Sequence, residues 1–312
     1  PAGQRPIDTL VAEFDPDLIV FCRYSGPYTD VIVNAARAMG RPVIFHIDDD
    51  LLNVPRALGV KKFVRHNLPP RKRALRYLLS NADLIYVSTA PLAARLENLG
   101  VTQPMVRGAL VCAADVIAPA EARPVKTIGY MGFDHAHDLK MVLPDLIAFL
   151  DEHEEVAFEL FGSIPVPSAL KRFGPRVRRL KPVRGYDAFM QAFAARRWEI
   201  GICPLQPTAF NRLKANNKWV EYTAVGAAVI ASRGMVYDTC CAEGCGVLID
   251  GAEGWRDALQ HLTRNPDERA HMVARAQRRL EQDYTPARLR HQVLDVFNEA
   301  AAQARTAQWT SH

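Results

Sequence analysis

Two cations and one carboxylate lie at helical spacing in the second half of the chain. Lys214, Lys218 and Glu221 share one face of a helix that we predict over residues 211–225. This set suits a nucleoside diphosphate, because ammonium groups pair with phosphates and a carboxylate accepts hydrogen bonds from a ribose diol. The same pattern is typical of an intrahelical salt-bridge set on a solvated face, and the charges alone leave both interpretations open.

A glycine-bearing loop between a strand and a helix is the second candidate for chemistry. The predicted strand 127–131 runs into Gly132, and a helix is predicted to begin near Asp138. Free N–H groups at a helix start suit a phosphate, and glycine allows it to approach. His135 and His137 can donate to a phosphate or to a sugar hydroxyl. The alternative is a tight turn in which Asp138 caps the helix.

An α/β fold is needed to position these residues. Short apolar runs alternate with amphipathic segments of helical length, and strands that are apolar on both faces indicate parallel sheets covered by helices. We therefore predict two Rossmann-like, doubly wound domains, the first of them shortened, followed by a helical C-terminal tail. The predicted strands are 17–22, 42–47, 83–88, 127–131, 157–161, 199–203, 228–231 and 246–249. The predicted helices are 28–39, 91–99, 139–150, 186–195, 211–225, 253–263, 266–282 and 286–307.

The domain boundaries follow from a break in this pattern. We expect an N-terminal domain over 1–118 and a second domain over 126–285, joined by a linker, 119–125, that has two prolines and no apolar period. The last helix, 286–312, is expected to pack back on the N-terminal domain. Few strands are readable before the linker, so we expect the first domain to be truncated, or to be completed by a partner domain or chain.

Composition limits the classes of function. The 312 residues are 49% hydrophobic and 23% charged with a net charge of +5, which is ordinary globular composition with a mild preference for anionic ligands. No apolar stretch is long enough to span a bilayer, and six scattered cysteines indicate a reduced, cytoplasmic protein. The basic stretch 61–76 forms a solvated helix face, a contact with anionic lipid at the inner face of the membrane, or a contact with a phosphate-bearing acceptor. Its aromatic residues are too sparse for nucleic acid.

A resemblance to a known family rests on the second half of the chain. The run Lys-x-x-Glu-Tyr-x-x-x-Gly from Lys218 to Gly226, followed by a strand of small residues, resembles the donor half of GT-B glycosyltransferases. It is most similar to the retaining glycosyltransferase family 4, in the subgroup with Phe-Asn-x-x-Lys before the donor helix. Other pieces follow in the family's order at 129–132, 161–162, 182–186, 200–205, 265–269 and 284–285.

The resemblance implies that one set of residues holds a nucleotide-sugar donor, with Glu221 at the ribose. The other members of this set are Gly132, His137, Val183, Tyr186, Lys214 and Lys218. His135 is expected to act in catalysis through a contact with the phosphate or the sugar.

Three acids, Asp48, Asp49 and Asp50, follow the predicted strand 42–47. Asp48 and Asp50 have the Asp-x-Asp spacing of the acids that bind a divalent metal in the GT-A glycosyltransferase fold. Carboxylates favour Mg²⁺ and Mn²⁺. Two α/β domains with a linker fit GT-B instead, so we expect no metal and no cofactor besides the donor substrate. Asp48 and Asp49 are then catalytic candidates that bind acceptor hydroxyls, one of them as a base. The plainer alternative is that they cap the next segment.

One departure from the family's pattern concerns the start of the donor helix. Members of family 4 usually carry a Glu-x7-Glu pair, and the first acid would fall at Leu213. The sequence predicts a glycosyltransferase that moves a sugar from a nucleotide diphosphate sugar to a glycan or lipid-linked acceptor, with retention, in surface polysaccharide synthesis. The alternatives are a non-catalytic GT-B-like scaffold or regulatory subunit, which the missing acid favours, and a nucleotide-sugar epimerase.

Overall fold

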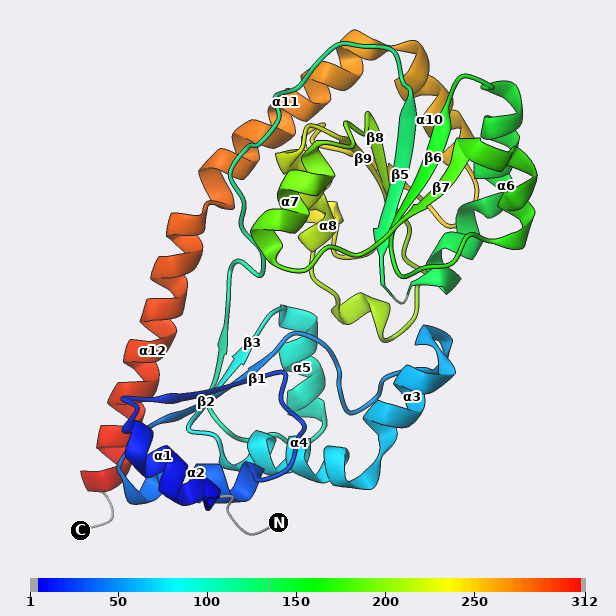
Figure 1. Cartoon of the computed structure of the whole chain (residues 1–312). Helices are drawn as coiled ribbons and strands as arrows, with labels where there is room; N and C mark the ends of the chain where they lie inside the picture. Colours follow the sequence, from blue (N-terminus) through cyan, green and yellow to red (C-terminus); the bar gives the residue numbers. More distant parts are fainter. Residues whose placement is uncertain (1–4, 134, 310–312) are drawn as a thin grey trace. The chain divides into compact units, whose positions relative to one another are not determined.

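The computed structural model describes residues 5–133 and 135–309, which form two compact α/β units (Figure 1). The first unit comprises Pro1–Val111, Leu213–Ala215 and Leu289–His312, and the second comprises Cys112–Arg212 and Asn216–Arg288. The boundary thus falls just before Cys112, and the segment that we expected as a linker, 119–125, lies in the second unit.

The first unit is built on a parallel sheet of four strands in the order β1-β2-β3-β4. The strands are β1 (Ile19–Cys22), β2 (Val43–Ile47), β3 (Leu84–Val87) and β4 (Met105–Arg107). The first three match predicted strands. The sequence did not predict β4, because its three residues are only half-buried or exposed and carry no apolar run.

Helices cover both faces of this sheet. One face packs on α2 (Thr29–Ala38), α4 (Pro69–Asn81) and α5 (Ala90–Asn98). On the other face, Val296 and Ala300 of α12 (Pro286–Trp309) pack against Ile44 and Leu84. The remaining helices of the unit are α1 (Ile7–Phe14), the short η1 (Arg56–Leu58) and α3 (Val60–Asn67).

The second unit holds a parallel sheet of six strands in the order β10-β9-β8-β5-β6-β7. Numbered from β5 as the first, this is the order 6-5-4-1-2-3 of the doubly wound fold, which reverses direction between β5 and β8. The strands are β5 (Thr127–Gly132), β6 (Ala157–Gly162), β7 (Val177–Leu180), β8 (Ile200–Cys203), β9 (Ala228–Ser232) and β10 (Val247–Ile249). The prediction of two doubly wound units with a helical tail is confirmed.

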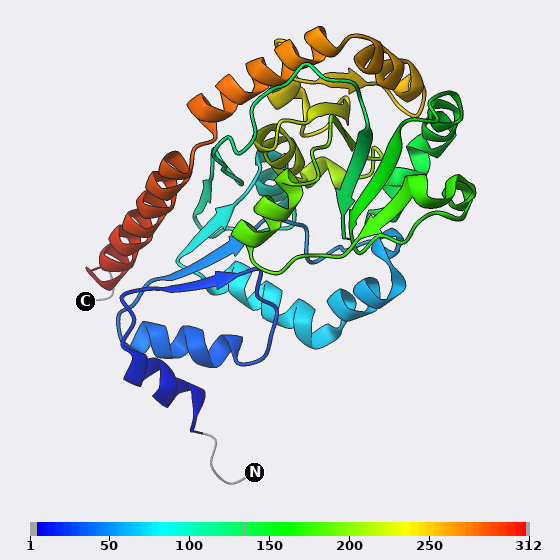
Figure 2. The same ribbon diagram turned by 45° about the horizontal axis from the view of Figure 1, so that its top comes forward.

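Helices also cover both faces of the second sheet, as Figure 2 shows from a second direction. One face packs on α6 (Ala136–Glu152) and α10 (Trp255–Arg264), and the other on α7 (Tyr186–Ala194), α8 (Asn217–Ala224) and α9 (Asp238–Cys241). The long α11 (Pro266–Asp283) contributes side chains to both faces. Two 3-10 segments, η2 (Ser168–Arg176) and η3 (Asn211–Leu213), lie in the connections after β6 and β8. None of the helices described in the chain is long and apolar enough to cross a bilayer.

The prediction of a continuous helix over 211–225 is wrong. A 3-10 turn covers Asn211–Leu213, the chain is irregular to Asn216, and α8 begins only at Asn217. Long-range contacts hold the irregular part: the Asn211 amide bonds to Asp138, and Leu213 packs in the core of the first unit. Lys214 therefore does not share a helical face with Lys218 and Glu221.

Two strand glycines make room for aromatic rings in the second unit. A Cβ on Gly129 in β5 would lie 2.1 Å from the Trp198 ring, and one on Gly201 in β8 would lie 2.2 Å from the Tyr222 ring. The two rings pack edge to face with centroids 5.9 Å apart. Tyr222 thereby reaches the carboxyl end of β5, where its hydroxyl accepts a hydrogen bond of 2.8 Å from the Met131 N–H.

Gly129→Ala is expected to lower the free energy of unfolding by about 1–3 kcal/mol, because the added methyl overpacks the site of the Trp198 ring. Urea unfolding of the variant and the wild type measures the difference. In a Trp198→Leu background, which empties the space beside Gly129, the same substitution should cost much less. An equal cost in both backgrounds would contradict the steric explanation.

Candidate functional site

The loops that follow β5 and β8 meet where the strand order of the second sheet reverses. In doubly wound sheets, ligands bind beyond the carboxyl ends of the strands at this position. Gly132 ends β5 beside Gly162 of β6, and a Cβ on Gly162 would lie 2.2 Å from the Gly132 carbonyl oxygen. Gly162 also has φ +132°, which L side chains rarely adopt, so close backbone packing shapes the base of the site.

A buried carboxylate joins the two loops. Asp138, in the first turn of α6, is fully buried, and its Oδ1 accepts hydrogen bonds from the Gln206 N–H (2.9 Å) and the Asn211 amide (2.8 Å). Its Oδ2 lies 2.7 Å from Nδ1 of His135, and its Oδ1 lies 3.4 Å from Nε2 of His137. Asp138 is therefore not the helix cap considered as an alternative; it is the tie between the loop after β5 and the loop after β8.

Hydrogen bonds keep Asp138 ionised despite its burial. Burial alone raises the pKa of this carboxyl, but the bonds from His135 and the Gln206 N–H outweigh it, and the net pKa lies below the ordinary value. Four donors or imidazole nitrogens surround one carboxylate, and none of them belongs to a lysine or arginine. His135 and His137 are thus held in fixed positions beside a buried negative charge, with their rings stacked 5.9 Å apart.

Two polar atoms beside Asp138 remain without a hydrogen-bond partner in the described part of the chain. They are Nδ1 of His137 and Oδ1 of Asn211, both buried. Within the same residues, His135, His137 and Asp138 form a group whose ligand atoms converge within 4.8 Å, a geometry able to hold a metal ion. The nitrogens and oxygens concerned already bond to one another, so a metal would have to displace those hydrogen bonds.

The cation and carboxylate of α8 lie close to these loops. Nζ of Lys218 is 4.5 Å from the centroid of the Tyr130 ring and 3.5 Å from its hydroxyl. The Tyr130 hydroxyl donates to the His135 carbonyl at 3.2 Å, so one tyrosine links Lys218 to the loop after β5. Glu221 lies one turn further along α8, where Lys218 is its main attractive partner.

The pKa of the Glu221 carboxyl is shifted far from its ordinary value. Burial raises its pKa to about 7, and the positive charge of Lys218 counteracts only part of this shift. Burial raises the pKa of Cys112 to about 12, and the negative charge of Glu221 adds to this shift. Burial also raises the pKa of Tyr186, with smaller contributions from Cys112 and then from Glu221. Glu221 therefore lies among Lys218, Cys112 and Tyr186 in a setting of low polarity, ready to exchange a proton or accept a hydrogen bond near neutral pH.

Val183 and Tyr186 present exposed side chains at the start of α7. Val183 is 36% exposed and Tyr186 47%, values that are high for large hydrophobic residues. The Tyr186 hydroxyl lies 3.5 Å from Sγ of Cys112, and its ring contacts that of Phe189 with centroids 6.1 Å apart. The structure thus brings Tyr186 near Glu221, as the sequence grouped them, and leaves Val183 and part of the Tyr186 ring exposed.

The predicted acids of the first unit are engaged in ion pairs. The Arg23 guanidinium lies 2.6 Å from Oδ2 of Asp48 and 3.1 Å from Oδ2 of Asp49. Lys214 adds a second cation at 2.7 Å from Oδ1 of Asp49. Oδ1 of Asp48 is buried and has no hydrogen-bond partner among the described residues. Lys214, expected beside Lys218, is thus grouped with the first unit and paired with Asp49.

Asp50 faces different partners from its neighbours. Arg95 donates to its Oδ2 at 3.3 Å, and the Asn53 amide donates to both oxygens at 3.0 and 2.9 Å. The two outer acids of the Asp48-x-Asp50 pattern are therefore committed to separate arginines.

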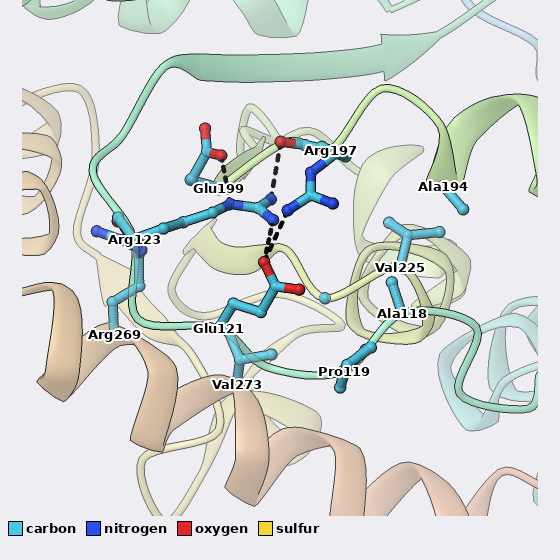
Figure 3. Close-up of a pocket in the computed structure, with 11 residues that line it drawn as sticks. Ala118, Pro119, Glu121, Arg123, Ala194, Arg197, Glu199, Val225, Arg269 and Val273 are labelled. Atoms are coloured by element: carbon cyan, nitrogen blue, oxygen red, sulfur yellow. Dashed lines mark hydrogen bonds and ion pairs between the residues drawn. The ribbon is translucent and has the colours of Figure 1, made fainter.

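A cavity of about 80 Å³ lies at the opposite, amino-terminal edge of the second sheet (Figure 3). Arg123 crosses it and lies 2.7 Å from Glu199 and 2.6 Å from Glu121, which also bonds to Arg197 at 2.8 Å. The buried guanidinium of Arg269 donates to the Arg123 carbonyl. This volume is far below the roughly 300 Å³ of small ligand sites, and the charges satisfy one another, so the cluster serves stability.

The sequence indicated residues that line the candidate site, but not the residues that hold its loops together. Asp138 was considered only as a cap, and Tyr130 and Gln206 carried no signal, because their roles depend on contacts with residues far along the chain. Asn211 was visible only as part of the Phe-Asn-x-x-Lys pattern. An Asp immediately before the predicted helix 139–150, next to two histidines, is a weak signal that points to the cluster only after the fold is known.

Comparisons with known proteins agree with this architecture. Residues 144–295 match the family model described as "Glycosyl transferase-like", and no curated protein sequence matches the chain. Among solved structures, TarM of S. aureus matches with a TM-score of 0.67 and 13% identity over 93% of this chain. HepE of Anabaena, solved with UDP and glucose, matches with 0.65 and 14% over 93%. The sucrose-phosphate synthase of Thermosynechococcus elongatus matches with 0.63 and 15% over 94%.

These comparisons establish the fold. The chain spans 57% of the length of TarM, 80% of HepE and 76% of the sucrose-phosphate synthase. Its two doubly wound units therefore define it as a protein of the GT-B fold, with a glycosyl transferase-like sequence over 144–295.

Replacing Glu221 with Gln is expected to remove one part of the pH dependence of stability. The pKa of Glu221 in the fold, about 7, lies above the value of 4.5 in a free chain, so the folded protein holds an extra proton between these pH values. The free energy of unfolding of the wild type therefore falls as the pH rises from about 4.5 to about 7.

Urea unfolding at pH 5 and pH 8 tests this expectation. Between the two pH values, Glu221→Gln should gain about 2–3 kcal/mol of stability on the wild type, from about 1.4 kcal/mol per unit of pKa. The exposed Glu253 provides a matched control, since Glu253→Gln changes the same charge without burial. Parallel pH profiles for wild type and Glu221→Gln would show that Glu221 ionises normally.

Proposed function

We propose that this protein is a glycosyltransferase that takes a sugar from a nucleotide diphosphate sugar. The observation that carries the proposal is the gathering of Gly132, Lys218 and Glu221 around the point where the strand order of the second sheet reverses. Nucleotides bind at this point in doubly wound sheets. Two comparisons support this proposal. Residues 144–295 have a glycosyl transferase-like sequence, and HepE, a protein of the same fold, has a crystal structure in complex with UDP-glucose.

The diphosphate leaving group is the feature that the site is suited to stabilise. As the glycosidic bond breaks, negative charge develops on the diphosphate. The Lys218 ammonium and the free N–H groups at the start of α6, beside Gly132, then bind it more strongly than in the ground state. His135 and His137 contact the phosphate or the sugar from positions fixed by Asp138. Because these groups are already in place, little reorganisation accompanies the reaction.

The nucleoside end is assigned to a neighbouring part of the same unit. Glu221 accepts hydrogen bonds from the ribose diol, and Val183 with Tyr186 provides an apolar surface for the base. Ionised Glu221 is the better acceptor, so donor affinity should rise with pH through about 7. This assignment makes Glu221 the residue with the largest share of nucleotide recognition.

The acceptor side of the proposal concerns the first unit. Asp48 and Asp49 are proposed to bind the hydroxyls of a glycan or lipid-linked acceptor, and the unpartnered Oδ1 of Asp48 is the atom suited to receive one. Retention of configuration, independence of metal and a role in surface polysaccharide synthesis belong to the proposal as well. Lys214, which the sequence grouped with the donor contacts, belongs to the first unit and pairs there with Asp49.

A non-catalytic scaffold on the GT-B fold is the second candidate. Two observations favour it: Leu213 occupies the place of an acid in the resembling family, and the predicted phosphate ligand Lys214 is neutralised by Asp49 at 2.7 Å. A scaffold of this kind would neither bind a nucleotide diphosphate at Glu221 nor hydrolyse a donor sugar slowly in the absence of acceptor.

Calorimetric titration with UDP, GDP, dTDP and CDP in EDTA tests the proposed function. We expect one nucleotide to bind with a micromolar Kd without metal, and Glu221→Ala to weaken it by about tenfold or more, because the ribose loses a charged hydrogen-bond acceptor. Glu253→Ala, an exposed glutamate of the same unit, is the control and should leave the Kd unchanged.

The outcomes of the titration separate the candidates. Binding that disappears in Glu221→Ala supports the donor site as assigned. Binding that appears only when Mg²⁺ or Mn²⁺ replaces EDTA overturns the metal-independent form of the proposal. No binding of any of the four nucleotides favours the scaffold.

A contact with a membrane surface is proposed for α3. Val60 and Val64, one helical turn apart, are 55% and 52% exposed, and Lys61, Lys62 and Arg65 flank them. An exposed apolar ridge among cations suits the surface of an anionic bilayer.

Sedimentation with vesicles tests this contact. The protein should bind vesicles of phosphatidylcholine with phosphatidylglycerol better than phosphatidylcholine alone, and Val60→Ser with Val64→Ser should weaken binding by about threefold or more. Leu294→Ser, at a similarly exposed position on α12, is the control. Equal binding of wild type and the α3 variant would exclude α3 as the contact.

A further inference from the structure

The first unit contains an open groove of about 310 Å³ that the donor site does not use. It lies between α4, the segment that follows α5, and residues 52–53 after β2. Its volume is at the lower end of the range for small-molecule sites, roughly 300–1,000 Å³, and fits one sugar-sized ligand. Lys72, Arg76 and Ser80 line it from one face of α4, at intervals of four residues.

Two cations in the groove have no counter-charge. Neither the Lys72 nor the Arg76 side chain has an ion pair or a hydrogen bond among the residues that the structure describes. No Asp or Glu is among the ten residues that line the groove. Side chains four apart on a helix have Cβ atoms about 5–6 Å apart, so both cations can reach one oxyanion. Without an anion, the like charges repel each other and weaken the helix by a few tenths of a kcal/mol.

The charge around the groove has one sign over a long stretch of chain. Residues 51–82 contain eight Lys and Arg residues and no Asp or Glu, whereas the whole chain has a net charge of only +5. The remainder of the chain therefore carries a net charge of −3 (5 − 8). The concentration of cations raises the local potential and attracts anions to the part of the first unit that contains α3 and α4.

The other lining groups suit a ligand with hydroxyls. Ser80 and Thr102 offer two hydroxyls, and Asn53, whose amide N–H groups bond to Asp50, offers its amide oxygen. The apolar part of the lining includes Leu79 and Val101. A sugar ring presents the same combination, with hydroxyls at its edge and C–H groups on its faces. A free oxyanion would use the two cations only.

We propose that this groove binds an oxyanion, phosphate or sulfate, carried on a sugar residue. As an assignment of the acceptor class, this rests on the proposed function: the groove becomes the subsite for a charged residue of the acceptor glycan. Asn53 lines the groove and donates to Asp50, next to Asp49. Four residues of chain span at most about 14 Å, so a short oligosaccharide can reach from the groove to the acids.

Titration of the full chain with glucose 6-phosphate at constant ionic strength tests the proposal, with glucose 6-sulfate, glucose and inorganic phosphate as the other arms. We expect binding of both charged sugars, weaker binding of inorganic phosphate and none of glucose. Lys72→Gln with Arg76→Gln should weaken the charged sugars by about tenfold or more. Arg65→Gln with Arg73→Gln is the matched control, since it removes two charges from the same stretch at exposed positions outside the groove. It should change the Kd by less than about twofold, given screening by salt.

Each outcome decides the proposal. Equal losses in the two double variants would mean a general attraction to the basic stretch and would overturn the groove as a site. Inorganic phosphate binding as tightly as glucose 6-phosphate would overturn the sugar part, and no binding by the wild type would overturn it entirely. The same samples are titrated with UDP, GDP, dTDP and CDP, and circular dichroism with thermal unfolding shows whether the variants are folded. A charged sugar that binds while no nucleotide does would leave the anion site in place and remove its role as an acceptor subsite.

Discussion

The buried carboxylate of Asp138 is the interaction on which the candidate donor site depends. An ionised group without solvent contact costs several kcal/mol unless partners satisfy it, and removing one partner of such a group is strongly destabilising. Asp138 meets this requirement by drawing the Gln206 N–H, the Asn211 amide and His135 onto its two oxygens. The loops after β5 and β8 are therefore fixed together at the place where the strand order reverses. The starts of α6 and α8, which carry the proposed donor contacts, follow from those two loops.

Charged residues serve stability at the amino-terminal edge of the second sheet and line the candidate site at its carboxyl edge. At the amino-terminal edge, Arg123 and Glu199 satisfy each other and the backbone around a cavity of about 80 Å³. At the carboxyl edge, Glu221 is held in surroundings of low polarity with a raised pKa, and Nδ1 of His137 lacks a partner among the described residues. Buried polar groups that lack a protein partner can form hydrogen bonds with a ligand. A cluster whose charges are all paired, such as that of Arg123 and Glu199, contributes to stability alone.

The first unit separates its charges in a similar way. Asp48, Asp49 and Asp50 follow β2 and are balanced by Arg23, Arg95 and Lys214. The next 32 residues, 51–82, hold only cations, and those on α4 that face the groove have no acidic neighbour in its lining. Like charges four residues apart on one helix, such as Lys72 and Arg76, are unfavourable by a few tenths of a kcal/mol, and the anion proposed for the groove would remove this repulsion.

The sequence by itself determined the elements whose apolar pattern is local. Eight strands and the two-unit doubly wound class could be predicted because continuous apolar runs between amphipathic segments are typical of buried parallel strands. The strands β4 and β7 could not be predicted. β4 has only three residues, and the sequence of β7, Val-Arg-Arg-Leu, is typical of a charged loop. Gly132, Lys218 and Glu221 could be proposed as donor contacts from the sequence, because a position at a strand end and a spacing along a helix are local information.

Only the tertiary structure decided the partners of the charged residues. Helical periodicity placed Lys214 with Lys218, but the contacts of Asn211 and Leu213 with residues far along the chain keep this segment out of a helix and leave Lys214 on Asp49. The sequence also suggested Asp138 as a helix cap. In the structure it joins two loops, because its partners Gln206 and Asn211 lie far along the chain. An ion pair or a buried hydrogen bond joins residues separated by tens to more than a hundred positions, and the pattern within one segment contains no information about which of them will meet.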